Sequence, residues 1–243
     1  MPSTDDVIAQ ADIFLNDPQK HTWHSCGKLL QAANQASPGD PEILLRLSRI
    51  AIEVAKLPST SLATKIKSSS ASINYAKVAV ELAPDNVITH RTLAVAFINA
   101  QKYLVAPATV FANHQPLRTA LLRTIELGDD DAATWHFYLG KCLFTVAHIG
   151  WFDLVVGNSI FGELEPATFD EALACFEKAQ ALSPDTNREN SYYMAAALTK
   201  LQRNAQAKAW LAKALGMPTP AEMSAEDDKA FSDMAWSLGA SLA

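Results

Sequence analysis

The stretch Asn187–Pro218, NRENSYYMAAALTKLQRNAQAKAWLAKALGMP, decides the fold. Its first helical segment carries Ala195, and its second carries Ala207, Leu211 and Ala214. Alanine at helix-crossing points lets two helix axes approach to about 8–10 Å, and a larger side chain one turn away fills the gap beside them. The pattern therefore predicts two antiparallel helices that pack closely, closed by a proline.

The preceding stretch 169–184, FDEALACFEKAQALSP, shows a closely similar spacing in Ala172, Phe176, Ala179 and Pro184. Both stretches resemble the tetratricopeptide unit, a helix pair with a period of about 34 residues and small residues where its helices touch. Phe176 should be a buried knob between two helices. We therefore predict an all-α protein, a tetratricopeptide-like α-solenoid of helix pairs with two insertions and a C-terminal capping helix.

The first helix of that preceding unit carries the pair Leu139-Gly140. In the repeat this pair normally stands about twelve residues before the alanine of the partner helix. Here Ala172 is much further away, and the intervening residues 148–166 are too apolar for a solvated loop. This insert should extend the first helix and then fold back.

The repeats predict one elongated domain over residues 1–243. Two further features interrupt the upstream part. Residues 57–70 are rich in serine and should form a loop, and Tyr103–Gln115, which contains Pro107, should be a second insertion followed by a helix from about Leu117 to Leu127. The predicted segments are an N-terminal helix pair (1–37), the first repeats (38–131), the repeat with the apolar insert (132–184), the last repeat (187–218) and the capping helix (220–243).

Composition favours a well-buried helical protein, since 49% of the 243 residues are apolar and only nine are glycine. No apolar run reaches the roughly 18–20 residues needed to cross a bilayer, and the N-terminus lacks the basic start and apolar core of a secretory signal. The three cysteines are widely spaced, which fits a reducing compartment. A soluble cytoplasmic protein is expected. Its net charge of −6 argues against a nucleic-acid partner.

A longer signature runs through the middle of the chain. It consists of Leu139-Gly140-Lys141-Cys142, Gly150-Trp151, Phe161-Gly162, Pro166, Thr168-Phe169, Glu171-Ala172-Leu173, Phe176, Ala179, Leu182-Ser183-Pro184 and Ala209-Trp210-Leu211. With this signature the chain resembles the regulator of microtubule dynamics family, from about Leu29 to Asp228. The resemblance implies a non-enzymatic adaptor that associates with microtubules or a microtubule-based assembly such as the spindle or an axoneme. Its partners would be proteins, with tubulin or microtubule-associated proteins as the first candidates.

Two surfaces are candidate binding sites for such partners. Family members usually carry basic residues after the insert tryptophan, whereas this chain has Phe152-Asp153-Leu154 there. The basic residues of the last repeat are therefore better candidates for contact with an acidic partner: Lys200, Arg203, Lys208 and Lys213. The alternative is that they only form a solvated outer face.

The second candidate is a groove on the face of the first helices, which line the concave side of a solenoid. Its predicted lining residues are Tyr138, Lys141, Trp151, Tyr192 and Tyr193. Such a groove could hold a peptide or an acyl chain, so a lipid-binding or membrane-contact module is the alternative function. The aromatic residues around the insert are expected to be mostly core.

The sequence contains no catalytic constellation, Gly-rich phosphate loop or metalloprotease motif, and no cofactor is predicted. His21, His24 and Cys26 are the residue types that bind metals, but a fourth ligand is missing from the local sequence. We interpret them as structural residues and predict no metal site and no enzymatic activity.

Overall fold

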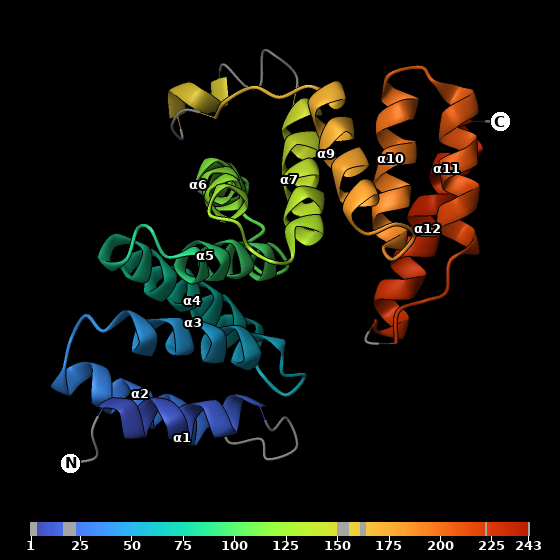
Figure 1. Ribbon diagram of the computed structural model, residues 1–243. Coiled ribbons are helices and arrows are strands. Elements are labelled where there is room, and N and C mark those ends of the chain that lie inside the picture. Colours follow the sequence, from blue (N-terminus) through green and yellow to red (C-terminus); the bar gives the residue numbers. More distant parts are fainter. Residues whose placement is uncertain (1–3, 17–22, 150–155, 161–163, 222, 243) are drawn as a thin grey trace. The chain divides into compact units, whose positions relative to one another are not determined.

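The computed structural model describes residues 4–16, 23–149, 156–160, 164–221 and 223–242. These residues form α-helices and their connections, which confirms the predicted all-α tetratricopeptide-like fold (Figure 1). The chain divides into two compact units, residues Met1–Asp129 and Asp130–Ala243, which we call unit 1 and unit 2. The boundary falls close to the predicted start of a repeat at residue 132. The organisation as one domain stays a prediction.

Unit 1 consists of successive helix pairs. Its helices are α1 (Thr4–Asn16), α2 (Trp23–Ala36), α3 (Pro41–Lys56), α4 (Leu62–Leu82), α5 (Val87–Ala100) and α6 (Pro107–Glu126). Each odd-numbered helix packs against the next even-numbered one, and α1, α3 and α5 also follow one another side by side (Figure 1). The helix starts are set by side-chain caps: Asp40 accepts a hydrogen bond from the Glu42 N–H, and Asn86 accepts one from the Ile88 N–H.

The serine-rich stretch 57–70 is not a loop beyond Ser61, so this prediction was wrong. The Ser61 hydroxyl caps α4 by accepting from the Thr64 N–H at 3.3 Å, and the helix runs on from Leu62. Ser69 and Ser72 are buried. The Ser48 hydroxyl on α3 donates to the Ser72 carbonyl at 3.0 Å. Small, hydrogen-bonded serines therefore allow α3 and α4 to pack closely, as alanines do at other helix contacts.

The helix predicted from about Leu117 begins ten residues earlier, at Pro107. Proline suits the first helical position because its missing N–H would have no partner there, so Pro107 starts α6. Pro116 lies inside the helix. Only residues 101–106 connect α5 to α6, and most of the stretch Tyr103–Gln115 is an N-terminal extension of the helix.

Unit 2 contains α7 (Ala132–Ala147), α9 (Phe169–Leu182), α10 (Arg188–Lys200), α11 (Asn204–Gly216) and α12 (Ala225–Ser241). Helix α7 pairs with α9, and α10 pairs with α11, while α12 packs on α10 and α11. Thr168 and Glu171 form a capping box at the start of α9, because each side chain accepts from the other residue's backbone N–H.

The α7–α9 contact explains the Leu139-Gly140 pair. Phe176 of α9 is fully buried, and its ring lies where a Cβ atom on Gly140 would be, 2.5 Å from Phe176 Cε1. Ala172 and Ala179, one turn on either side of Phe176, are also buried. The predicted arrangement of small residues around an aromatic knob is therefore present.

The insert is described in part. Helix α7 ends at Ala147 with His148 as its C-cap, so the prediction that the insert extends this helix was wrong. Residues 156–160 form a short helical turn. The Asn158 side chain accepts from the Leu164 N–H at 2.8 Å and donates to the Leu164 carbonyl at 3.2 Å. Leu164 is buried, so these two hydrogen bonds fix the end of the insert close to the start of α9. Residues 150–155 and 161–163 lie outside the described residues.

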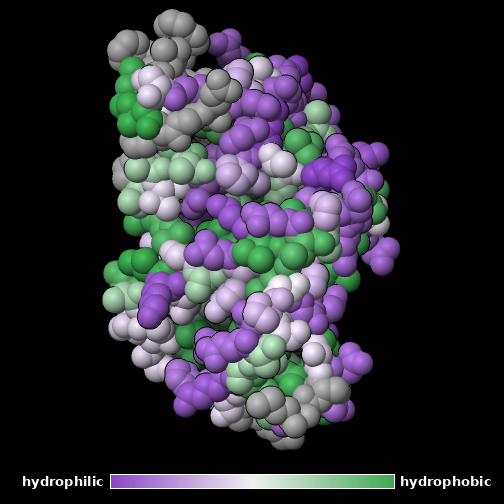
Figure 2. Space-filling view, turned by 90° about the vertical axis from the view of Figure 1, so that its left-hand side faces the viewer, coloured by the Kyte–Doolittle hydropathy of each residue, from purple (hydrophilic) through white to green (hydrophobic). Residues whose placement is uncertain are grey.

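Large apolar side chains that remain exposed, such as Ile13, Val105 and Trp236, come from different segments of the chain. Figure 2 shows one face of the molecule, on which hydrophobic residues lie among hydrophilic ones. Within the described part of the chain, no helix combines the length and the apolar character needed to span a membrane.

Candidate functional site: the groove of unit 2

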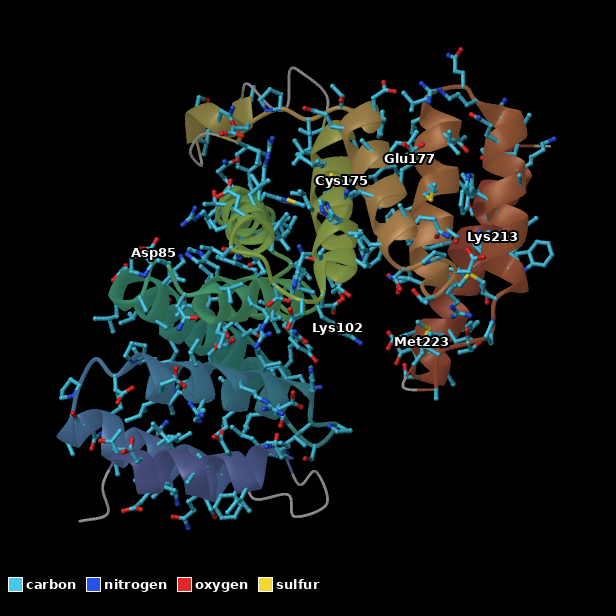
Figure 3. The ribbon with its side chains drawn as sticks, viewed as in Figure 1. Asp85, Lys102, Cys175, Glu177, Lys213 and Met223 are labelled. Atoms are coloured by element: carbon cyan, nitrogen blue, oxygen red, sulfur yellow. The ribbon has the colours of Figure 1, made fainter. Side chains whose placement is uncertain are left out.

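Unit 2 has a groove of about 600 Å³ between the first helices of its successive pairs. Helices α7, α10 and α12 and the loop before α12 supply its walls, and Met223 of that loop is marked in Figure 3. The lining residues are Thr134, Phe137, Tyr138, Thr186, Asn187, Arg188, Glu189, Pro220, Met223, Asp227, Ala230, Phe231 and Met234. Aromatic and methionine side chains thus alternate with charged and polar ones, as in sites that bind peptides.

The start of α10 places two charged residues in this groove. Asn187 caps the helix by accepting from the Asn190 N–H, so Arg188 and Glu189 occupy the first turn. Arg188 is 6% exposed and forms an ion pair with Asp228 of α12. Its guanidinium carbon lies 4.1 Å from the Phe231 ring centroid. Arg188 therefore holds α12 in place and contributes little free charge to a ligand.

Lys141 of α7 is surrounded by aromatic rings. Its Nζ atom lies 5.2 Å from the ring centroid of Phe137, 5.7 Å from that of Tyr138 and 5.1 Å from that of Tyr193. The same atom forms an ion pair with Glu189 at 3.2 Å. Cation–π attraction and the ion pair together stabilise this ammonium group, so it is held against the lining residues Phe137, Tyr138 and Glu189.

The three predicted groove tyrosines keep their phenol protons at neutral pH. Burial raises the pKa of Tyr193 to about 12, and it also raises the pKa values of Tyr138 and Tyr192. Tyr193 stacks on Phe176, with ring centroids 5.6 Å apart, and so belongs to the core beneath the groove. Tyr192 lines an adjacent depression of about 490 Å³ together with Met234 of α12.

Of the predicted lining residues, Tyr138 lines the groove and Tyr192 lines the adjacent depression, whereas Lys141 and Tyr193 lie beside them without lining either. Trp151 lies outside the described residues. Sequence reasoning missed the opposite wall, formed by residues of α12 such as Phe231 and Met234. The sequence did indicate that α12 covers the last repeat, and its apolar positions Phe231 and Met234 could have suggested a wall.

The four basic residues of the last repeat do not form one compact cluster. Arg203 precedes α11 and pairs with Asp170 at 3.2 Å, whereas Lys213 pairs with Asp185 and lies 4.5 Å from the Trp210 ring centroid (Figure 3). Ten residues of helix separate Arg203 from Lys213, which corresponds to roughly 15 Å. That distance exceeds the Debye length of about 8 Å at physiological ionic strength.

Lys200 and Lys208 are different, because both are exposed. Neither forms an ion pair with a described carboxylate. Lys200 ends α10 and Lys208 lies in the second turn of α11. These two ammonium groups, with Arg203 between them in the sequence, are the part of the predicted basic patch most available to an acidic partner.

Of the three residues His21, His24 and Cys26, which were predicted to be structural, the structure describes His24 and Cys26. Cys26 is buried, and its thiol donates to the Ala11 carbonyl with a sulfur–oxygen distance of 3.9 Å. His24 is exposed on α2, and His21 lies outside the described residues. Among the residues that the structure describes, no three His, Cys, Asp or Glu side chains converge to hold a metal ion.

Helix pairs whose first helices line a groove define the class of tetratricopeptide-like repeat proteins. Comparison with solved structures agrees with the fold. A crystal structure of MamA protein matches with a TM-score of 0.60 at 16% identity, covering 87% of this chain and 92% of that chain. A second MamA structure, AMB-1 in the C2221 crystal form, matches with a TM-score of 0.58 at 17% identity, covering 88% and 95%.

Sequence comparison identifies the family. Residues 7–238 match the family described as regulator of microtubule dynamics protein 1-3, and the chain belongs to it. Regulator of microtubule dynamics protein 1 of Mus musculus is 27% identical over 219 residues, which cover 90% of this chain and 69% of the relative. Regulator of microtubule dynamics protein 3 of Rattus norvegicus is 30% identical over 96 residues, covering 40% and 20%.

Proposed function

We propose that this chain is a non-enzymatic adaptor that associates with microtubules, through tubulin or a microtubule-associated protein. Membership of the regulator of microtubule dynamics family over residues 7–238 carries the proposal. The tetratricopeptide-like fold supports it, since such repeats present extended surfaces to protein partners. A cytoplasmic microtubule assembly, such as the spindle or an axoneme, is the corresponding location.

In this proposal, the exposed basic residues of the last repeat contact the acidic partner. Lys200 and Lys208 are available without breaking an ion pair, whereas Arg203 would have to exchange Asp170 for the partner. Such exposed contacts steer and orient a complex more than they strengthen it, and salt weakens them.

The groove of unit 2 is proposed as the second contact, for a peptide segment of the partner. Its polar groups suit a peptide backbone, and Phe137, Phe231 and Met234 suit an apolar side chain. The lipid alternative has less support in this groove, because the carboxylates of Glu189 and Asp227 line it and would repel an anionic head group.

Co-sedimentation with microtubules tests the proposal. The wild-type chain should pellet with microtubules at low salt, and its binding should weaken as salt rises. The double variant Lys200→Glu/Lys208→Glu should bind about two- to thirtyfold more weakly, because exposed charge pairs contribute about 0.2–1 kcal/mol each. Its melting temperature should stay close to that of the wild type, since both side chains are exposed.

The control is Lys229→Glu, which makes the same charge change as each of the two substitutions, at an exposed position of α12. It should bind as the wild type does. Absence of wild-type binding to microtubules at low salt would overturn the proposed function. Equal losses in the double variant and in two charge reversals placed elsewhere on the surface would overturn the assignment of the contact to Lys200 and Lys208.

A further inference from the structure

The two units differ in charge. Unit 1 contains 12 lysines and arginines against 11 aspartates and glutamates, whereas unit 2 contains 8 against 15. Their formal charges of +1 and −7 account for the total of −6. A negatively charged ligand is therefore repelled by unit 2 on average, and unit 1 is the more favourable place for it.

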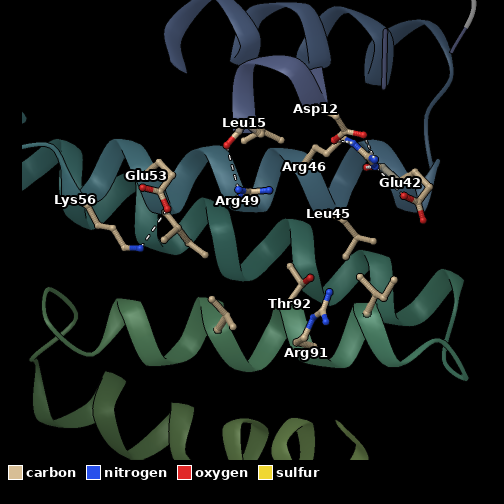
Figure 4. A pocket seen from close by; sticks show the side chains of 13 residues that line it. Asp12, Leu15, Glu42, Leu45, Arg46, Arg49, Glu53, Lys56, Arg91 and Thr92 are labelled. Carbon is tan, nitrogen blue, oxygen red and sulfur yellow. Dashed lines mark hydrogen bonds and ion pairs between the residues drawn. The ribbon is translucent and has the colours of Figure 1, made fainter. Parts of the chain in front are cut away.

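Unit 1 has a groove of about 460 Å³ in the position equivalent to the groove of unit 2, between the first helices α1, α3 and α5 (Figure 4). The residues that line it are Asp12, Leu15, Glu42, Leu45, Arg46, Arg49, Ile52, Glu53, Lys56, Ile88, Arg91, Thr92 and Val95. Four basic side chains and three carboxylates therefore meet an apolar floor.

The three carboxylates already have partners within the groove. Arg46 binds Asp12 through two hydrogen bonds, of 2.8 Å from Nε and 2.7 Å from Nη2, and binds Glu42 at 2.7 Å (Figure 4). Lys56 pairs with Glu53 at 3.2 Å. The Arg46 hydrogen bond, aided by the charge of Arg49, lowers the pKa of Asp12, so the Asp12 carboxylate stays ionised at neutral pH.

Arg49 is the basic residue of α3 in this groove that takes no part in these ion pairs. Its side chain is exposed, and among the described residues its one hydrogen-bond acceptor is the backbone carbonyl of Leu15, at 3.1 Å from Nη2. A guanidinium carries five N–H donors, so most of them remain available to a ligand. Figure 4 shows the Arg49 side chain lying along α3 on the side that faces the pocket.

Arg91, on the next first helix α5, lines the same groove (Figure 4). It donates to the buried Asp129 carboxylate at 3.2 Å, but its own side chain is 45% exposed. Asp129 fixes one end of the guanidinium and leaves another edge open to the groove. Each of these two arginines, one held by a carbonyl and one by a carboxylate, can bind a carboxylate through its remaining N–H groups.

The floor between the arginines is apolar. Leu45 and Ile52 are buried there, while Ile88 is 40% exposed beside Thr92. A ligand that fills this groove should therefore combine negative charge with an apolar side chain. A phosphate-rich polyanion fits less well, because Asp12, Glu42 and Glu53 line the same groove and would repel closely spaced charges.

We propose that the groove between α1, α3 and α5 binds an extended acidic segment of a partner protein, with its carboxylates on Arg49 and Arg91 and an apolar side chain over Ile88. This site is separate from the groove and the basic residues of unit 2, and the proposal does not depend on microtubule binding.

Fluorescence anisotropy with the full chain tests the site directly. The probe is a labelled ten-residue peptide in which glutamates alternate with leucine or valine, and the comparison peptide has glutamine in place of every glutamate. The wild-type chain should bind the glutamate peptide at least about tenfold more tightly than the glutamine peptide at low salt, because charge-assisted hydrogen bonds exceed neutral ones. Higher salt should reduce this difference.

Arg49→Glu should weaken binding of the glutamate peptide at least about tenfold. Arg49→Gln keeps a donor for the Leu15 carbonyl and removes the charge, so it separates loss of binding from loss of folding. It should also weaken binding, with an unchanged circular dichroism spectrum. The matched control is Lys67→Glu, which reverses an exposed charge on α4 of the same unit and should leave binding unchanged.

Three results would overturn the proposal. They are equal binding of the two peptides, wild-type affinity in both Arg49 variants, and competition by a single-stranded oligonucleotide at concentrations as low as those of the unlabelled glutamate peptide. None of these measurements involves microtubules. Failure of the peptide site is therefore distinguishable from failure of the proposed function, which co-sedimentation decides.

Discussion

Gly140 and Phe176 determine how closely α7 and α9 approach each other. The Phe176 ring is fully buried and has the rings of Phe137, Phe144 and Tyr193 as neighbours, with centroid distances of 6.3, 6.5 and 5.6 Å. The ring rests on the bare backbone of Gly140, where any Cβ atom would overlap it. The floor of the candidate groove in unit 2 depends on this one contact, because Phe137 and Tyr193 belong to the same cluster.

Gly140→Ala should destabilise the protein by about 1–3 kcal/mol, because the added methyl group forces the Phe176 ring to move and outweighs the better helix propensity of alanine. Phe176→Ala should cost about 3–5 kcal/mol through the cavity that it leaves. Chemical denaturation of both variants measures these losses.

The control for the glycine is Gly216→Ala near the end of α11, where an added Cβ atom would have no neighbour within 4 Å. It should leave stability nearly unchanged or raise it slightly. A loss below about 1 kcal/mol in Phe176→Ala would contradict the assignment of Phe176 as the knob between the helices.

Residues of this kind could be predicted from the sequence because repeat spacing reports on helix contacts. Ala172, Phe176 and Ala179 lie where the pattern placed them. The pairing of Lys141 with Glu189 could not be predicted, because these residues are 48 positions apart and no periodicity links them. The same holds for Arg203 and Asp170, whose ion pair changes which basic residues are available to a partner.

At the scale of elements, α12 is held by few contacts. Phe231 and Ala235 are its buried residues, and Arg188 of α10 links it to the groove through Asp228. The loop before α12 contributes to the same contact, because Arg188 also donates to Thr219 Oγ1 at 3.1 Å. One wall of the groove in unit 2 therefore depends on a polar contact at its base.

The Arg188 hydrogen bond holds the pKa of Asp228 below its ordinary value of 3.8. A lowered carboxyl pKa in the folded state stabilises the protein above that ordinary value, and this stabilisation is lost as the pH falls through the folded-state pKa. Asp228→Asn should therefore lower the melting temperature at neutral pH and increase hydrogen exchange in α12. The difference from the wild type should shrink below about pH 4.

Asp233→Asn is the matched control, since Asp233 is an exposed carboxylate of the same helix. It should leave hydrogen exchange in α12 unchanged at pH 7 and at pH 3. A difference between Asp228→Asn and the wild type that is as large at pH 3 as at pH 7 would show that the ionised pair does not hold α12.

The sequence predicts least well the helical segments that contain residue types typical of loops. Serine and proline are typical of loops, yet Ser61 caps α4, Ser69 is a buried residue of that helix and Pro107 starts α6. Each fits a helix at its particular position, as a cap, as a small buried residue or at the first turn. The number of serines and prolines in a stretch of sequence does not distinguish these helical positions from loops.

At the scale of the whole molecule, the distribution of charge separates two kinds of surface. Unit 1 is slightly basic and has a groove with an available arginine, whereas unit 2 is acidic and has exposed lysines near the α10–α11 turn. The sequence had indicated the basic residues of the last repeat, because they are close together along the chain. The arginines of the groove in unit 1 could not be predicted as a site, since Arg49 and Arg91 come from different helix pairs and line one groove only in the fold.

The division into two compact units makes a prediction about how stability is distributed. In helical repeat proteins each repeat is stabilised mainly by its neighbours, so a local change should act locally. Phe176→Ala should therefore increase the hydrogen exchange of amides in α7, α9 and α10, while amides in α3 and α4 keep most of their protection. Mass spectrometry of peptic fragments, under conditions where the variant stays folded, measures both regions in one experiment.

The reciprocal change is Ile43→Ala, which removes a fully buried side chain of α3 in unit 1. It should raise exchange in α2, α3 and α4 and leave the protection of α9 and α10 largely unchanged, because the core around Ile43 is formed by unit 1 alone. Equal loss of protection throughout the chain in both variants would instead mean that all the helices unfold as a single cooperative domain. Protection that responds region by region would show that the groove of each unit is stabilised by its own helices, so that a ligand in one groove stabilises that unit first.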